Sequence, residues 1–262
     1  MDLGLKDKVA LVAASSTGIG RATAERFAAE GARVAMCARG EAKLNAAAAE
    51  IRSRHRADVF AQALDVTNPS AVRDFVSAVA ARFGGVDVCV TNAGGPPAKN
   101  FLSVTSDEWQ RAVEVNFLSV VYLAREVIPH MQRKRWGRIV TLTSVSVKQP
   151  IAELIMSNAV RAAVVGLVKS LSNDFGQDGI TVNNVAPGYT ETGRLKELAG
   201  TRALALGVTP DHIRQTWSAE IPLRRLARPE EVADTIVWLA SERASYITGQ
   251  TLLVDGGIYK GL

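Results

Sequence analysis

The chain of 262 residues has only two cysteines, Cys37 and Cys89, and three histidines. Each cysteine lies inside an apolar run typical of a buried strand, so we expect two reduced core thiols rather than a disulfide framework, and no metal site. No apolar stretch reaches the ~20 residues that a bilayer span requires, and the opening MDLGLKDKVAL lacks the apolar centre of a signal peptide. We therefore expect a soluble cytoplasmic protein.

Aromatic residues make up 6% of the chain, and the formal net charge is +5. A positive charge could indicate nucleic-acid binding, but Lys and Arg are scattered among acids, and no basic run is interleaved with aromatic residues. We expect neither a nucleic-acid nor a membrane partner. The length and the 47% hydrophobic content are enough for one large domain with a well-filled core.

Short β-branched segments alternate with longer helical patterns along the whole chain. The segments expected to form strands are residues 8–13, 32–39, 59–66, 86–94, 137–144, 180–188 and 250–257. Helical periodicity covers residues 18–31, 41–54, 68–83, 106 to about 135, 154–171 and 229–242. Nearly continuous apolar strands separated by helices predict a doubly wound α/β fold, with a seven-stranded parallel sheet and helices on both faces.

One segment does not fit the alternation. Residues 189–222 are mixed in polarity and helical only in patches, and they precede the last helix and strand. We interpret residues 1–262 as a single domain with a lid-like insertion at about 189–222. Its leucines, Trp217 and Ile221 either cover a ligand or pack against another subunit, and the sequence leaves both open.

The segment LVAASSTGIGRATAERFA, residues 11–28, has the pattern of a strand, a turn and a helix. Backbone N–H groups at a helix N-terminus bind anions, and glycines let a pyrophosphate approach the chain. Only Gly18 and Gly20 are present here, which alone is a weak signal. The position directly after the first strand predicts a dinucleotide-binding domain, and the alternative is a turn made for packing alone.

The residues after the second strand indicate which dinucleotide is bound. An acid there would bond the ribose 2′-hydroxyl of NAD, but this chain has Ala38 followed by Arg39. Arg39 offers a guanidinium group to a 2′-phosphate, so NADP(H) is favoured over NAD(H). The alternative is that Arg39 is an ordinary solvated charge at a strand end.

Several motifs occur in an order that resembles the short-chain dehydrogenase/reductase family, especially its branch of 3-oxoacyl-carrier-protein reductases. They are ASSTGIG (14–20), Asp65-Val66, TNAG (91–94), Asn116 in EVNFLSV, Ser144 in TLTS, APGYTET (186–192) and TGQTLLVDGG (248–257). The resemblance spans nearly the whole chain. It implies a Rossmann fold, a nicotinamide cofactor, and hydride transfer to or from a ketone or secondary alcohol.

The resemblance also implies roles for individual residues. The cofactor-binding candidates are Ser16, Thr17, Gly18, Ile19, Gly20, Arg39, Asp65, Val66, Asn92, Ala93, Gly94, Arg161, Pro187, Gly188, Thr190 and Thr192. The catalytic candidates are Asn116, Ser144, Ser157 and Arg161. Family members usually pair through helices that correspond to residues 115–134 and 154–175, which implies a homotetramer or homodimer. Ala159, Ala163, Val164 and Leu167 give faces compatible with such packing.

Three positions depart from the family pattern. Ala14 stands in place of the first glycine, although alanine tolerates negative φ and not positive φ, and Thr91 replaces the first Asn of NNAG. The family carries Tyr-x-x-x-Lys thirteen residues after its serine, where this chain has Ser157 and Arg161. The tyrosine acts as the general acid and base, and the lysine lowers its pKa and holds the nicotinamide ribose.

These departures leave three functions open. The first is an NADP(H)-dependent oxidoreductase with an altered proton relay, in which Ser157 and Arg161 hold a water, or in which Lys148, Glu153 or Tyr189 supplies the proton. The second is a catalytically degenerate NADP(H)-binding sensor or inactive subunit. The third is a dehydration or isomerisation in which Arg161 stabilises an oxyanion.

Overall fold

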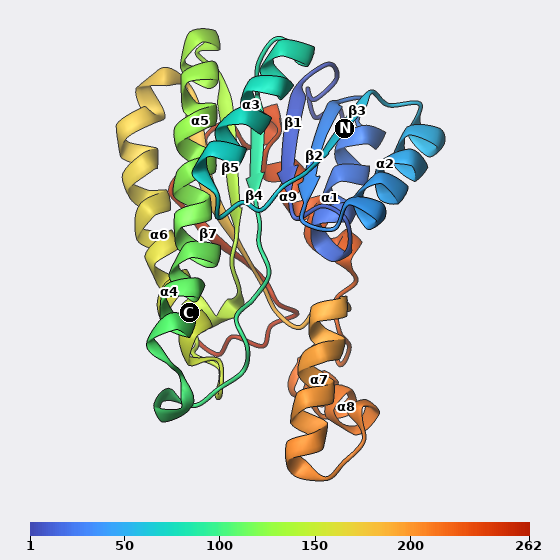
Figure 1. Cartoon of the computed structure of the whole chain (residues 1–262), viewed down its shortest axis with the longest axis vertical. Coiled ribbons are helices and arrows are strands. Elements are labelled where there is room, and N and C mark those ends of the chain that lie inside the picture. Colours follow the sequence, from blue (N-terminus) through green and yellow to red (C-terminus); the bar gives the residue numbers. More distant parts are fainter.

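The computed structural model describes all residues from 1 to 262. Seven strands form one parallel sheet in the order β3-β2-β1-β4-β5-β6-β7 (Figure 1). The strands are β1 (Val9–Ala13), β2 (Arg33–Ala38), β3 (Val59–Ala63), β4 (Val88–Thr91), β5 (Gly137–Leu142), β6 (Ile180–Pro187) and β7 (Thr251–Val254). The predicted seven-stranded, doubly wound α/β fold is confirmed.

Helices cover both faces of the sheet (Figure 1). One face carries α1 (Gly18–Ala29), α2 (Glu41–His55) and α9 (Pro229–Leu239), and the other carries α3 (Pro69–Phe83), α5 (Ser119–Lys134) and α6 (Ile155–Phe175). A short helix, α4 (Ser106–Val113), continues into α5 through a π-helical turn, Glu114–Leu118. Single 3-10 turns lie at Phe101–Ser103, Val145–Val147, Gly176–Asp178 and Glu242–Ala244.

The central strands are buried because both of their faces are covered, which explains their nearly continuous apolar sequences. Cys37 and Cys89 are both buried and unbonded, as expected for core thiols. Burial raises the pKa of the Cys37 thiol to about 12 and also raises that of Cys89. Both thiols therefore stay protonated, which makes them poor nucleophiles.

The sheet reverses its strand order at β1. This strand pairs with β2 on one side and with β4 on the other, with Val12 opposite both Met36 and Val90. In open α/β sheets, ligands bind in the crevice beyond the carboxyl ends of the strands at such a point. A ligand site is therefore expected among the loops that follow β1, β4, β5 and β6.

The segment 189–222 is more regular than its sequence indicated. It forms α7 (Gly193–Leu206) and α8 (Pro210–Glu220), which extend away from the sheet (Figure 1). Thr192 and Thr209 cap the two helices with their side chains. Trp217 and Ile221 are buried in a small core between the helices, and Trp217 also lines two cavities beside them. That this unit acts as a lid remains a prediction.

Other boundaries also differ from the predictions. β3 and β4 end at Ala63 and Thr91, earlier than predicted, because the residues that follow leave the ladder and line cavities. Val164 packs in the core, so it is not free for a subunit contact, whereas Ala159 and Ala163 are exposed. None of the helices combines the length and apolar character needed to cross a bilayer.

Candidate active site

The turn between β1 and α1 leaves the start of the helix open. The N-cap residue Thr17 makes no side-chain cap, and the first turn of α1 holds no acid. The first backbone N–H groups therefore face outward with a partial positive charge. A Cβ at Gly20 would overlap the carbonyl oxygen of Ala14, and Gly18 has a φ of +57°, so both glycines are required by the local backbone. This open cradle fits the pyrophosphate of a dinucleotide.

Ala14 adopts a conformation that suits glycine. Its φ is +50°, in the left-handed region, which costs a residue with a Cβ about 1–2 kcal/mol. The family pattern has glycine at this position, because alanine tolerates positive φ poorly. Ala14 nevertheless adopts the left-handed backbone conformation of this turn. Ala14 lines both of the cavities described next, so this residue lies where they adjoin.

The first cavity, which we call the Arg39 cavity, has a volume of about 540 Å³. Arg39 and Lys43 contribute positive charge to its wall, and neither makes an ion pair. On the same wall, the carboxylate of Asp65 accepts hydrogen bonds from the backbone N–H of Thr67 at 3.0 Å and from Arg111 at 3.1 Å. Burial raises the pKa of Asp65, but these hydrogen bonds outweigh it, and the net shift is downward.

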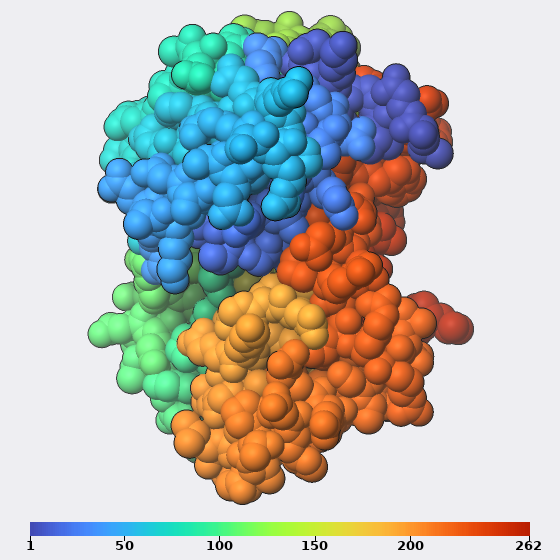
Figure 2. Space-filling model, turned by 90° about the vertical axis from the view of Figure 1, so that its right-hand side faces the viewer, coloured from blue at the N-terminus to red at the C-terminus, as the bar shows by residue number.

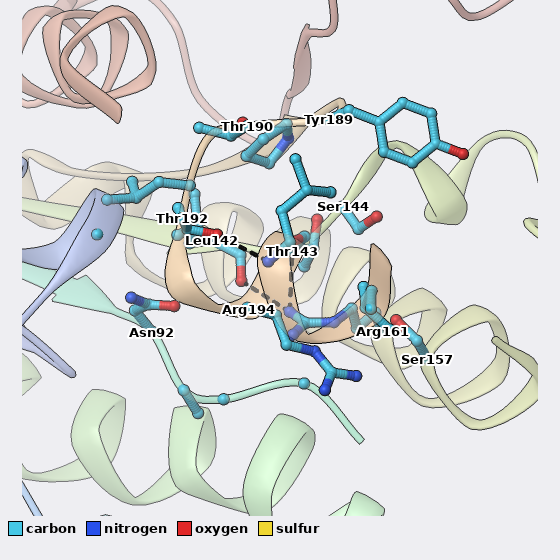
Figure 3. Close-up of a pocket in the computed structure, with 18 of the residues that line it drawn as sticks. Asn92, Leu142, Thr143, Ser144, Ser157, Arg161, Tyr189, Thr190, Thr192 and Arg194 are labelled. Carbon is cyan, nitrogen blue, oxygen red and sulfur yellow. Dashed lines mark hydrogen bonds between the residues drawn. The ribbon is translucent and has the colours of Figure 1, made fainter. Parts of the chain in front are cut away.

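The second cavity, the serine–arginine cavity, has a volume of about 320 Å³ and is shown in Figure 3. Ser144 reaches it from the end of β5, and Ser157 and Arg161 reach it from consecutive turns of α6. Ser157 is 7% exposed and Arg161 is 8% exposed. The Oγ atom of Ser144 accepts a hydrogen bond from the backbone N–H of Ser146 at 3.2 Å, which leaves its own proton free to donate.

The guanidinium group of Arg161 is held by backbone carbonyls. Its Nη1 atom donates to the carbonyl oxygens of Leu142 at 3.2 Å and Thr143 at 3.4 Å (Figure 3). No carboxylate pairs with it, and none of the residues lining the cavity is an acid. Burial, assisted by the nearby positive charge of Arg194, lowers the pKa of Arg161 to about 10. The group therefore remains a cation at neutral pH.

Asn116 lies apart from the other three catalytic candidates. The π-helical turn between α4 and α5 carries it, and its Nδ2 atom donates to the carbonyl oxygen of Gly94 at 2.7 Å. Its Oδ1 atom is buried and has no partner. Asn116 lines the Arg39 cavity, whereas Ser144, Ser157 and Arg161 line the other.

The two cavities form one continuous cleft at the carboxyl edge of the sheet. Ala14, Thr17, Ala93 and Gly94 line both of them. Figure 2 shows a recess between the N-terminal part of the chain, in blue, and the unit of α7 and α8, in orange. The cleft runs from the end of β2, past the open start of α1, to the two serines.

Comparison with known proteins agrees with this architecture. A family profile described as Enoyl-(Acyl carrier protein) reductase matches residues 13–259. The 3-oxoacyl-[acyl-carrier-protein] reductase FabG of Vibrio cholerae is 36% identical over 262 residues, with 98% of this chain and 99% of the relative covered. The chain belongs to the short-chain dehydrogenase/reductase family.

Solved structures of short-chain dehydrogenases/reductases superpose closely on it. The L-sorbose reductase of Gluconobacter frateurii, complexed with NADPH and L-sorbose, has a TM-score of 0.95 and 35% identity, with both chains fully covered (100%). The actinorhodin polyketide ketoreductase with NADPH has a TM-score of 0.93 and 32% identity, and the match covers 97% of this chain and 98% of that one. The fold and the oxidoreductase class of this chain follow from these matches.

The cleft brings together nearly all residues that the family resemblance selected. Of the cofactor-binding candidates, only Gly20 lines neither cavity, since it packs against the backbone of Ala14. The serine–arginine cavity contains Thr17, Gly18, Ile19, Asn92, Ala93, Gly94, Arg161, Pro187, Gly188, Thr190 and Thr192. The Arg39 cavity contains Ser16, Arg39, Asp65 and Val66, and it shares Thr17, Ala93 and Gly94. Their roles remain predictions.

Sequence reasoning missed three cations in the cleft. Lys43 lies in the first turn of α2, whereas Arg39 precedes that helix, so no helical spacing connects the two residues. Arg111 comes from the distant helix α4, so no local pattern connects it with Asp65. Arg194 comes two residues after Thr192, but the sequence of 189–222 has no regular pattern, and no motif indicates where the Arg194 side chain lies.

Proposed function

We propose that this chain is an NADP(H)-dependent oxidoreductase that transfers a hydride between the nicotinamide and a ketone or secondary alcohol, including 3-oxoacyl compounds. The observation that carries the proposal is the continuous cleft from the uncapped start of α1 to Ser144, Ser157 and Arg161. A bound nicotinamide supplies the hydride, and the protein holds the carbonyl and delivers the proton.

The preference for NADP(H) is supported by charge. Arg39 and Lys43 stand in the wall of the cavity that adjoins the open helix start, and no carboxylate neutralises them. A guanidinium and an ammonium group suit a 2′-phosphate. The similar L-sorbose reductase and polyketide ketoreductase are both complexed with NADPH, which is consistent with this choice.

Proton delivery requires a different arrangement from that of the family. A serine hydroxyl ends roughly 4 Å short of the position of a tyrosine oxygen, and it has no phenol that titrates near pH 10. The Ser157 hydroxyl makes no hydrogen bond within the protein, yet it is not sealed from the cavity. We infer that a water held by Ser157 and Arg161 fills the vacant space and passes a proton to a carbonyl polarised by Ser144.

The remaining proton donors are less suitable. Lys148 and Glu153 are exposed and do not line the serine–arginine cavity. Tyr189 lines it, but its ring stacks on Trp217 at 4.8 Å, and its hydroxyl points away from Arg161 in Figure 3. Burial raises the pKa of Tyr189, which makes it a weaker acid.

The proposal is tested by mixing the protein with NADPH and a panel of diketones, 3-oxoacyl thioesters, enoyl thioesters and quinones, and following absorbance of the reduced cofactor. We expect oxidation with ketones. Ser144→Ala should lower kcat by about 10²–10³-fold, since one polarising donor is lost. The double variant Ser157→Tyr with Arg161→Lys should raise kcat, because general acid catalysis contributes typically 10²–10⁴-fold. Unchanged or lower turnover of that variant, with NADPH binding retained, would contradict the relay.

A second function is favoured by two observations. The strained Ala14 at the cradle and the missing phenol at position 157 both fit a degenerate NADP(H)-binding sensor or inactive subunit. NADPH binding without consumption by any ketone of the panel would support this alternative. Absence of NADPH binding would remove both functions.

We also infer that the protein forms a homodimer or homotetramer through α5 and α6, and Ala159 and Ala163 are exposed on α6. Small exposed residues let two helices approach closely. The unit of α7 and α8 would then act as the lid of each cleft. Sizing chromatography at micromolar concentration tests the assembly, and a monomer would contradict it.

A further inference from the structure

The serine–arginine cavity contains two guanidinium groups and no acid. Besides Arg161, the cavity wall includes Arg194, which reaches across the cleft from α7. The Nη2 atom of Arg194 donates to the carbonyl oxygen of Pro96, and its Nη1 atom contacts the exposed carboxylate of Glu197 at 3.1 Å. Figure 3 shows the two guanidinium groups beside each other. The cavity therefore concentrates positive charge that the protein itself only partly neutralises.

Arg161 has hydrogen-bond donors that the protein does not use. Only its Nη1 atom is hydrogen-bonded, and its Nε and Nη2 atoms have no partner in the protein. Neither atom is sealed off, since neither belongs to the buried, unpartnered polar atoms of the chain. The side chain is more than nine-tenths buried, so these donors can be reached only through the cavity.

A buried cation without a counter-ion is unfavourable, and an anion that enters the cavity relieves that cost. The Nε and Nη2 atoms lie on one edge of a planar guanidinium group, which matches the two oxygens of a carboxylate. Arg194 adds a second cation to the same cavity, beside the first. A neutral ketone gains nothing comparable from this charge.

We propose that the substrate is an oxo acid, or the corresponding hydroxy acid in the reverse direction, with its carboxylate between Arg161 and Arg194 and its carbonyl beside Ser144. This inference rests on the proposed function, whose site it specifies. In the reduction, the carbonyl carbon accepts a hydride as the nicotinamide is oxidised, and the carbonyl oxygen takes one proton from water. The carboxylate is unchanged and serves only to bind and orient the substrate.

The test compares acids with their neutral esters in binding, without turnover. Acetoacetate and methyl acetoacetate, and likewise 2-oxobutyrate and its methyl ester, are titrated calorimetrically into the protein saturated with NADP⁺. We expect each acid to bind at least about tenfold more tightly than its ester, as is typical when charged hydrogen bonds are added. Arg194→Met should lower the affinity for the acids by about tenfold and leave that for the esters unchanged, and Arg194→Lys should keep part of the difference.

Arg202→Met is the matched control. Arg202 lies on the same helix, makes no ion pair, and lines neighbouring cavities instead of this one. This variant removes one positive charge from α7 and should leave the affinity for the acids unchanged. An equal loss in Arg202→Met and Arg194→Met would mean that only the overall charge matters, which overturns a defined carboxylate site.

Other outcomes also overturn the proposal. Equal affinity for acid and ester excludes a carboxylate site, and tighter binding of a ketone phosphate such as dihydroxyacetone phosphate assigns the cations to phosphate. Weaker NADP⁺ binding by Arg194→Met, with unchanged acid binding, would assign Arg194 to the phosphates of the dinucleotide. Failure of the wild-type protein to bind NADP⁺ instead contradicts the proposed function. The acids are then titrated into the protein alone, where loss of binding in Arg194→Met still decides the carboxylate site.

Discussion

Replacing Ala14 by glycine tests whether the turn at the cofactor cradle is strained. The φ of +50° costs alanine about 1–2 kcal/mol, and glycine removes this cost. Glycine also makes the unfolded chain more flexible, which costs about 0.4–1 kcal/mol. With the midpoints of these two ranges, the expected net effect of Ala14→Gly is a stabilisation of about 0.8 kcal/mol. For a domain of this size, that corresponds to a rise in Tm of about 2–3 °C.

Thermal and urea unfolding of Ala14→Gly and Ala13→Gly together provide the measurement. Ala13 is the preceding residue, buried in β1, and it has no positive φ. Glycine there brings only the entropic cost and lost packing, so Ala13→Gly should lower stability by about 0.5–1 kcal/mol or more. The two neighbours should therefore shift Tm in opposite directions. A fall in Tm for Ala14→Gly similar to that of Ala13→Gly would refute the argument for backbone strain.

Two further predictions concern charge. Arg39→Ala should weaken NADPH binding by about tenfold and leave NADH binding unchanged, because only NADPH carries a 2′-phosphate. Cofactor fluorescence measures both affinities, and equal losses for the two cofactors would contradict a contact between Arg39 and the 2′-phosphate. Glu231 accepts hydrogen bonds from Arg225 at 2.7 Å and from the backbone N–H of Arg228 at 2.8 Å, which lower its pKa to about 2. A lowered carboxyl pKa stabilises the fold above the unfolded value of 4.5, and this contribution is lost as pH falls toward 2. Glu231→Gln should therefore be less stable than the wild type at pH 7, by up to about 1 kcal/mol because the pair of Glu231 and Arg225 is partly exposed. The difference in the free energy of urea unfolding between the two proteins should shrink as pH falls from 4.5 to 2. A difference that stays constant over this range would disprove the prediction.

The sheet was predictable because its strands are apolar on both faces and separated by helical periods. The cradle was predictable because a strand, a glycine turn and a helix are adjacent in the sequence. The position of Arg194 was not predictable, because it depends on how α7 packs beyond the sheet. That packing is set by a separate small core around Trp217. The position of Asn116 depends on one extra residue in a helical turn, which no periodicity of the surrounding sequence reveals.

The end of β5 connects the two parts of the proposed chemistry. The carbonyl groups of Leu142 and Thr143 hold the guanidinium of Arg161, and the next residue, Ser144, presents its hydroxyl to the same cavity. Because these residues directly extend a buried strand, the cation and the polarising hydroxyl are placed by rigid backbone. Arg194 instead approaches from α7, outside the sheet, and contacts the loop after β4. A substrate held between them would therefore meet one fixed wall and one wall that depends on the position of α7, so changes in α7 should alter affinity more than the rate of hydride transfer.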